Sequence, residues 1–213
     1  MSSPDIFLIP RTLDFELSNM DRSVWAKSPR TLIDRYWNGS SAPKHRSFTA
    51  CLLWSDDFFY VRFDAAQAEL LVVSVSPKTE IKTLGLWDRD VCEIFIAPDD
   101  AEPRRYFEFE VAPTGEWVDL SIDSTDGTRK TDTEYRSGME AFAEIGQDTV
   151  TMAMKIPWGA FGKRPGSGDV WRGNLFRCVG CDPDRGYLAW SPTMTEVPNF
   201  HVPDRFGKFV FVE

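Results

Sequence analysis

The sequence predicts an all-β protein, an antiparallel β-sandwich of the jelly-roll or immunoglobulin-like kind with few short helices. Short runs that alternate apolar and polar residues recur along the chain, and Gly, Pro, Asp and Asn stand between them, which is the pattern of a sandwich. Helical periodicity is scarce, so the alternating strands and helices of α/β proteins are not expected. The chain has 213 residues, of which 42% are hydrophobic. It can therefore bury a substantial core, and we expect a single domain over residues 1–213.

Periodicity predicts the elements in chain order. The expected strands are 47–54, 58–65, 70–75, 91–97, 105–113, 116–122, 139–145, 149–156, 171–179 and 208–213. The first two are separated by three polar residues, which predicts a hairpin. Short helical turns are expected over 20–28 and 156–163. The segment 121–138 is polar and rich in turn residues, so we expect a mobile surface loop there.

The charge of the chain excludes two classes of partner. The net charge is −9 and the isoelectric point is near 4.8, so we expect neither nucleic acid nor an anionic membrane as a partner. No apolar run approaches the ~20 residues of a membrane span. The first residues lack the basic and apolar regions of a secretory leader. As written, the sequence indicates a cytoplasmic protein, or a secreted or periplasmic one if a leader has been removed.

The four cysteines are too few for a disulfide scaffold at this length. Cys51 and Cys92 stand singly in strand-like runs and are expected in the core. Cys178 and Cys181 have the C-x-x-C spacing of a zinc or redox motif, but no second pair completes a zinc site. We interpret them as two thiols near the end of a strand, and a local disulfide stays open for a secreted protein.

Three consecutive strands are expected to have one apolar side and one side that mixes carboxylates with aromatic rings. The apolar sides comprise Cys92, Ile94 and Ile96, then Phe107, Phe109 and Val111, then Val118, Leu120 and Ile122. Glu93, Glu108 and Glu110 fall on the mixed sides, as does Asp119. Sequential strands are usually neighbours, so the mixed sides are expected to join into one face. Two interpretations stay open at this point, a solvated outer face and a binding face.

Several motifs together carry a family resemblance. They are W-x-x-D-x-x-E-I-F at 87–95, YFEFEVAPTGEW at 106–117, the segment at 150–158 that ends in I-P-W, W-R-x-N-x-x-R at 171–177, and P-x-x-F-G at 203–207 before the last strand. With these motifs the chain resembles the family 9 carbohydrate-binding modules (CBM9) and their stand-alone relatives. The resemblance is sparse but covers most of the chain.

The resemblance implies a β-sandwich that grips a sugar between two aromatic rings. The first ring falls on Trp87 and the hydroxyl-binding carboxylate on Glu93. The second ring falls on Phe200, where the family has a tryptophan, and the family's basic residue on the next strand aligns with Glu110. The studied modules prefer the reducing ends of cellulose- and xylan-type chains. The candidate ligand-binding residues are Trp87, Glu93, Glu110, Arg177, Asn199, Phe200 and His201.

The chemistry of a sugar suits these residue types independently of the resemblance. A pyranose has an apolar face of C–H groups and a rim of hydroxyls, so it needs a flat aromatic ring and ionised or polar partners. Trp87 supplies the ring and Glu93 the acceptor. Structural roles stay open as alternatives: Trp87 as a cover for the sandwich edge, Phe200 as a plug, and His201 as a cap of its own loop.

The expected function is therefore non-catalytic binding of an oligo- or polysaccharide, in the service of polysaccharide utilisation and with a glycoside hydrolase as a conceivable partner. The alternative is a glycoside hydrolase that uses Glu93 with Glu108 or Glu110 as a carboxylate pair. No catalytic residue and no cofactor is assigned. The resemblance implies that structural calcium is possible, and Asp56–Asp57, Asp99–Asp100 and Asp182–Asp184 offer oxygen atoms. None has EF-hand spacing, so no metal ligand is assigned.

Overall fold

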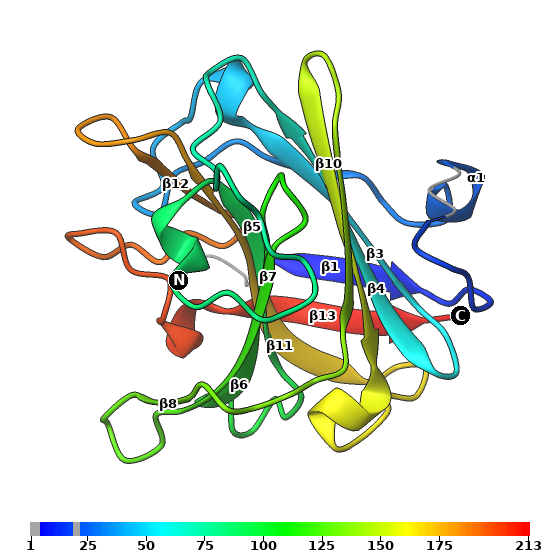
Figure 1. Ribbon diagram of the computed structural model, residues 1–213. Helices are drawn as coiled ribbons and strands as arrows, with labels where there is room; N and C mark the ends of the chain where they lie inside the picture. The colour runs from blue at the N-terminus through cyan, green and yellow to red at the C-terminus, as the bar shows by residue number, and fades with distance from the viewer. Residues whose placement is uncertain (1–4, 19–21) are drawn as a thin grey trace.

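The computed structural model describes residues 5–18 and 22–213, and they form two β-sheets packed face to face (Figure 1). The first sheet has the order β1 (Ile6–Pro10), β13 (Gly207–Val212), β11 (Val170–Val179), β5 (Val91–Ala97), β6 (Arg105–Val111), β7 (Trp117–Asp123) and β8 (Lys130–Asp132), with β12 (Gly186–Ala189) also paired to β11. The second sheet has the order β2 (Thr31–Ile33), β3 (Phe48–Trp54), β4 (Phe58–Ala66), β10 (Thr149–Pro157) and β9 (Glu140–Ile145). Apart from the parallel pair β1–β13, the strand pairs described in the two sheets are antiparallel. The predicted all-β sandwich is confirmed.

The helical elements are short. They are α1 (Arg22–Trp25) and the 3-10 turns η1 (Lys44–Arg46), η2 (Leu86–Asp88), η3 (Trp158–Phe161) and η4 (Pro203–Arg205). α1 and η3 lie within the two predicted helical turns, although residues 20 and 21 of the first one lie outside the described part of the chain. Among the described residues, no helix has the length and apolar character that crossing a bilayer would require.

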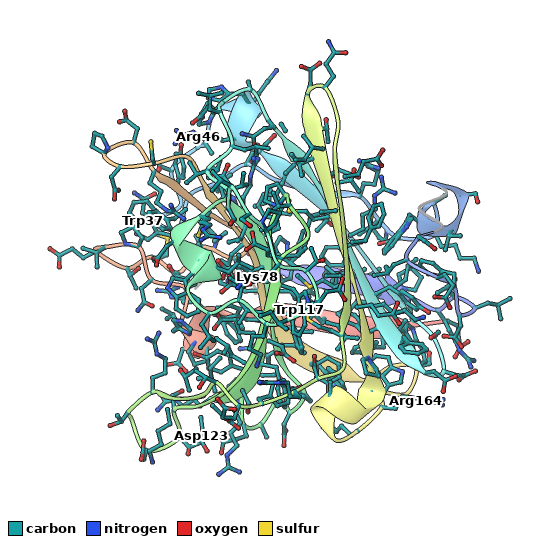
Figure 2. All side chains as sticks on the ribbon, in the orientation of Figure 1. Trp37, Arg46, Lys78, Trp117, Asp123 and Arg164 are labelled. Carbon is teal, nitrogen blue, oxygen red and sulfur yellow. The ribbon has the colours of Figure 1, made fainter. Side chains whose placement is uncertain are left out.

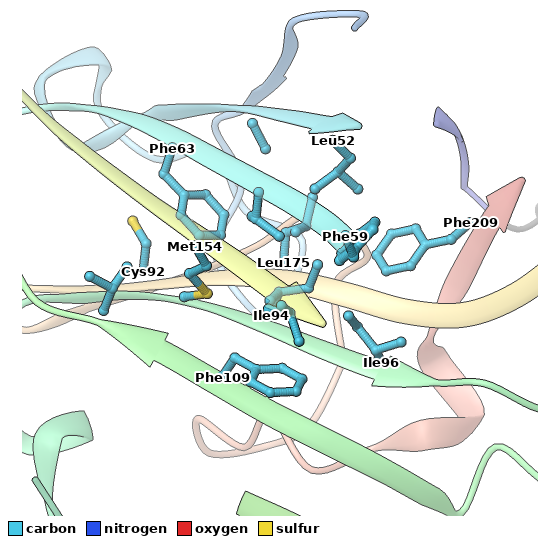
Figure 3. Close-up of a cluster of buried hydrophobic side chains, with 14 of the residues drawn as sticks. Leu52, Phe59, Phe63, Cys92, Ile94, Ile96, Phe109, Met154, Leu175 and Phe209 are labelled. Atoms are coloured by element: carbon cyan, nitrogen blue, oxygen red, sulfur yellow. The ribbon is translucent and has the colours of Figure 1, made fainter. Parts of the chain in front are cut away.

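The main core lies between the two sheets, where the apolar sides of the strands meet (Figure 3). Phe63 of β4, Ile94 of β5, Phe109 of β6 and Leu175 of β11 are each 0% exposed there. The ring of Phe109 packs edge-on against Phe161 of η3, with centroids 5.7 Å apart. These positions follow the period of two along their strands, so the predicted apolar sides of β5 and β6 are confirmed.

The predicted strand at 70–75 is wrong. Leu70 and Val75 are fully or almost fully exposed, and the segment forms no strand. The backbone of Val72 instead exchanges hydrogen bonds with Asp90: its N–H donates to the Asp90 carboxylate (3.2 Å) and its carbonyl accepts from the Asp90 N–H (2.9 Å). The polar segment 121–138, predicted as a loop, contains the end of β7 and the short strand β8. Sequence analysis also missed β1, β2 and β12.

The side assigned to β7 is wrong as well. Leu120 lies directly opposite Glu108 in the β6–β7 register, and directly opposed residues share a face. The apolar side of β7 therefore shares a face with the carboxylates, whereas Trp117 and Asp119 point toward the other sheet. Figure 2 shows Trp117 toward the middle of the molecule and Asp123, at the end of the same strand, near the periphery. The apolar side of β7 is buried, and so is the side of β6 that carries the carboxylates. Alternation therefore identified the apolar side of β7 but not the face of the sheet that it joins.

Candidate functional site

The face that carries the carboxylates is covered rather than solvated. Glu93, Glu108 and Glu110 are 2%, 3% and 0% exposed. Together with apolar residues of β5, β6, β7 and β11 they lie beneath the turn η2 and the segment 198–206. The apolar members of this second core are Leu86, Val91, Phe95, Ala97, Tyr106, Ala112, Val118, Leu120, Ile122, Phe176, Cys178, Ala189, Phe200 and Phe206. The interpretation of these three strands as a solvated outer face is therefore wrong.

A pocket of about 380 Å³ opens between these covering segments. It brings together five of the seven candidate residues, namely Trp87, Glu93, Asn199, Phe200 and His201. Glu110 lies directly opposite Glu93 in the β5–β6 register, below the pocket lining. Sequence analysis missed Tyr187 and Arg129 in the wall of the pocket, because nothing in their local sequence connects them with Trp87.

Trp87 belongs to a turn whose backbone conformation is fixed by a left-handed glycine and by hydrogen bonds. Gly85 precedes η2 with φ 79°, a left-handed conformation that favours glycine. The Asp90 carboxylate accepts from the N–H groups of Gly180 (2.7 Å) and Val72 (3.2 Å). The guanidinium of Arg185 donates to the carbonyls of residues 87, 88 and 89 at 2.8, 2.8 and 2.7 Å. The turn is therefore fixed, and it presents the indole of Trp87 with 40% of the residue exposed.

Phe200 contributes to the pocket differently from Trp87. Its ring stacks on Phe176, with centroids 4.0 Å apart and planes 11° apart, and only 9% of the residue is exposed. Tyr187 packs edge-on against Phe200 (6.1 Å). One face of the Phe200 ring is thus occupied by the protein, and Trp87 is the more accessible of the two predicted rings.

His201 connects the covering segment to the sheet. Its Nδ1 is 2.9 Å from the hydroxyl of Tyr106, and its Nε2 is 3.9 Å from a carboxylate oxygen of Glu108. Burial, with a smaller contribution from Arg129, lowers the pKa of His201 to about 3, so the ring is neutral near pH 7. The loop itself is capped by Asn199, whose side-chain oxygen accepts from the His201 N–H at 3.0 Å.

The three glutamates form a compact cluster, which we call the carboxyl triad. One oxygen of each of Glu93, Glu108 and Glu110 lies within 4.8 Å of the other two. Burial raises the pKa of all three carboxyl groups. Repulsion from Glu108 raises the pKa of Glu93 further, and repulsion from both neighbours raises that of Glu110. Like charges so close together in a dry environment cannot all be ionised without a counter-charge.

Arg177 does not lie in this pocket, which corrects its assignment as a ligand contact. In the β11–β5 register it is opposite Cys92, so its side chain points into the space between the sheets. There its guanidinium donates to the carbonyls of Arg46 (2.8 Å), Ser47 (3.1 Å) and Ala66 (2.8 Å) and to the side-chain oxygen of Gln67 (2.7 Å). Arg177 therefore ties the two sheets together.

The cysteines are free in the structure. Cys178 is buried on the pocket side of β11, with its sulfur 3.5 Å from a Glu93 oxygen, and Cys181 is exposed. Of the acidic clusters considered for calcium, Asp56 forms ion pairs with Arg11 (2.6 Å) and Arg164 (2.8 Å). In the described part of the chain, the carboxyl triad is the group of acidic residues that brings three ligand atoms together.

The triad predicts a pH-dependent stability. Because the folded-state pKa of Glu110 lies above its unfolded value, its contribution stabilises the fold at low pH and is lost as the pH rises through the folded-state pKa. Glu110→Gln removes the ionisation and supplies an N–H donor to the neighbouring carboxylates. We expect it to raise the stability at pH 8 by at least about 1 kcal/mol, or about 2–4 °C in Tm, and to have little effect at pH 4.5. Thermal melts at both pH values measure this.

The exposed Glu144→Gln on β9 serves as the control and should melt like the parent at both pH values. Equal Tm shifts for Glu110→Gln at pH 4.5 and pH 8 would show that the Glu110 carboxyl carries no ionisation penalty in the folded protein.

Comparisons with known proteins agree with this architecture. A family model described as "Carbohydrate family 9 binding domain-like" matches residues 19–213. A crystal structure from Bacteroides uniformis, of a protein provisionally assigned as carbohydrate-binding, has a TM-score of 0.72 at 19% identity and covers 98% of this chain and 100% of its own. A family 9 carbohydrate-binding module from Caldicellulosiruptor kristjanssonii in complex with cellotriose has a TM-score of 0.70 at 13% identity, covering 98% of this chain and 94% of its own.

The same kind of module from that organism in complex with glucose has a TM-score of 0.67 at 14% identity, covering 97% of this chain and 95% of its own. At these identities the likeness establishes a shared fold. No curated protein matches the chain.

Proposed function

Because the chain belongs to the carbohydrate family 9 binding domain-like family, we propose that it binds a carbohydrate without transforming it, in the pocket beside Trp87. The observation that carries the proposal is the placement of an accessible indole on a fixed turn above a pocket that also contains Glu93. The indole offers a flat apolar surface to the C–H face of a pyranose, and the polar side chains of the pocket offer partners for its hydroxyls.

Family membership supports carbohydrate as the ligand class, and the two C. kristjanssonii modules bound to cellotriose and glucose make glucose-based sugars the first ligands to test. A role in polysaccharide utilisation, alone or beside a glycoside hydrolase, would follow from such binding. A glycan array on the purified protein tests the ligand class directly, and growth of a deletion strain on the polysaccharides that score in the array tests the role.

Catalysis is the competing function, and the buried triad argues against it. An inverting glycosidase separates its two carboxyl groups by about 6.5–9.5 Å to admit water, and a retaining one by about 5–5.5 Å. Oxygens of the triad approach one another within 4.8 Å, and no pair of these carboxyls is solvated. We expect no turnover of aryl β-glucosides. Turnover that disappears in Glu93→Gln would favour the enzyme instead.

Trp87→Ala is expected to weaken binding of the identified sugar by at least about 30-fold, or about 2 kcal/mol, because a desolvated aromatic anchor dominates a shallow site. The side chain is only half enclosed, so the variant should keep the Tm of the parent within a few degrees. Isothermal titration calorimetry beside thermal melts measures both quantities.

Trp87→Phe is the matched control because it keeps a flat ring on the same turn, and it should lose much less affinity. If Trp87→Ala binds as tightly as the parent, or fails to fold, the indole covers the sandwich edge and does not contact a ligand.

A further inference from the structure

We propose that the carboxyl triad forms a subsite for the protonated amine of an amino sugar, at the floor of the pocket proposed above for carbohydrate. The inference rests on that proposed function and specifies its ligand. It starts from the three glutamates that β5 and β6 place together, Glu93, Glu108 and Glu110.

The triad contains buried acceptors for which the surrounding protein supplies no donor. Among the described residues outside the triad, none donates to either carboxyl oxygen of Glu110 or to Oε2 of Glu108. Within the triad, Glu108 and Glu110 hydrogen-bond to each other, which requires a proton on one of them. Glu110 is 0% exposed and lies below Glu93 and Glu108, which line the pocket, so it is poorly solvated. A buried polar atom without a partner is costly, and the cost disappears when a donor enters the triad.

The charges around the triad favour a cation. Asp88 of η2 adds a third carboxyl group to the pocket lining, beside Glu93 and Glu108, and its charge raises the pKa of Glu110 further. The guanidinium groups nearby are Arg129, an exposed residue of the pocket wall, and Arg185, whose donors are directed at backbone carbonyls.

The other titratable groups that face the triad supply no positive charge. His201 is neutral near pH 7, and burial raises the pKa of both the Tyr106 hydroxyl and the Cys178 thiol. These groups therefore do not balance the charge that ionisation of the triad creates.

The geometry fits an ammonium group. A point central to three oxygens that lie within 4.8 Å of one another is within about 2.8 Å of each, so one nitrogen placed there is within reach of a charge-assisted N–H···O bond to all three. An –NH₃⁺ group has three donors for the three carboxyls. Ca²⁺ requires about 6–8 oxygens, and the rest of the floor is formed by Phe95, Leu120 and Cys178. A sugar hydroxyl would satisfy one acceptor and leave the charge unbalanced.

Three matched sugars test the inference by calorimetric titration at pH 7. D-Glucosamine should bind at least 10-fold more tightly than D-glucose, and N-acetyl-D-glucosamine, whose amide is neutral, should show no such gain. Because the ammonium stabilises ionised carboxylates, glucosamine binding should release protons from the triad, which titrations in two buffers of different ionisation enthalpy detect. Glucose should release none.

Glu110→Gln should reduce the ratio of glucosamine to glucose affinity to about 1, whereas the exposed Glu144→Gln should keep the parental ratio. Thermal melts show that each variant is folded, and Glu108→Gln serves as a second test if Glu110→Gln does not fold.

Equal affinity for glucosamine and glucose, or a preference that persists in both triad variants, overturns the inference and leaves the proposed function intact. Stabilisation of the protein by Ca²⁺ without any preference for glucosamine also overturns it, since the triad would then be a metal site. If none of the three sugars binds and the glycan array is empty, the proposed function fails as well.

Discussion

Arg177→Leu is expected to lower the free energy of unfolding by about 3–5 kcal/mol or to prevent folding. The side chain is 2% exposed and donates to four acceptors, three of them carbonyls of the segment 46–66 in and beside the opposite sheet. Leucine cannot donate, so the four part-buried oxygens beside the second sheet lose this partner, at about 1–3 kcal/mol for each oxygen left unsatisfied. Urea denaturation followed by circular dichroism measures the loss.

Arg105→Leu is the matched control, because this arginine is 67% exposed in its side chain and pairs with the half-exposed Asp123. Its loss should cost no more than about 1 kcal/mol. Similar midpoints for Arg177→Leu and Arg105→Leu would contradict the role of Arg177 as a tie between the sheets.

Phe109→Ala is expected to cost about 3–5 kcal/mol, because it removes a fully buried ring and leaves a cavity. Phe109 is 0% exposed and packs against Phe107 and Phe161. Ile145→Ala, on the edge strand β9 and 53% exposed, provides the control and should cost less than about 1 kcal/mol. Equal losses in urea midpoints would mean that Phe109 does not face the core.

Alternation predicted β5 to the residue and correctly placed the apolar sides of β5 and β6 in the main core. It also identified the apolar side of β7, but that side faces the second core instead. The second core exists because η2 and the segment 198–206 cover the outer face of the sheet, and their paths depend on contacts far apart in sequence. Arg185, for example, is 96 to 98 residues from the carbonyls it binds.

The residues of the candidate site that lie in one local sequence motif could be predicted, and the others could not. Trp87 and Glu93 lie in one nine-residue motif, and the structure places both in the same pocket. In the structure Arg177 shares its side of β11 with Leu175 and Val179, which face the main core, whereas the sequence left its side ambiguous and Arg177 was named as a candidate ligand contact. Only the tertiary structure reveals the carbonyls that accept its hydrogen bonds. The burial of Glu110 could not be predicted either, because it depends on covering segments that are distant in the sequence.

The central claim is that the pocket beside Trp87 binds carbohydrate, and a crystal structure of the protein with saturating D-glucose, or with the sugar that the glycan array selects, tests it most directly. We predict a pyranose ring packed on the indole of Trp87, with a hydroxyl or amine about 2.7–3.2 Å from a Glu93 oxygen. A sugar bound elsewhere, for example in the groove lined by Tyr36, Trp37 and Arg46, of which Figure 2 labels Trp37 and Arg46, with the pocket beside Trp87 empty, would contradict the claim.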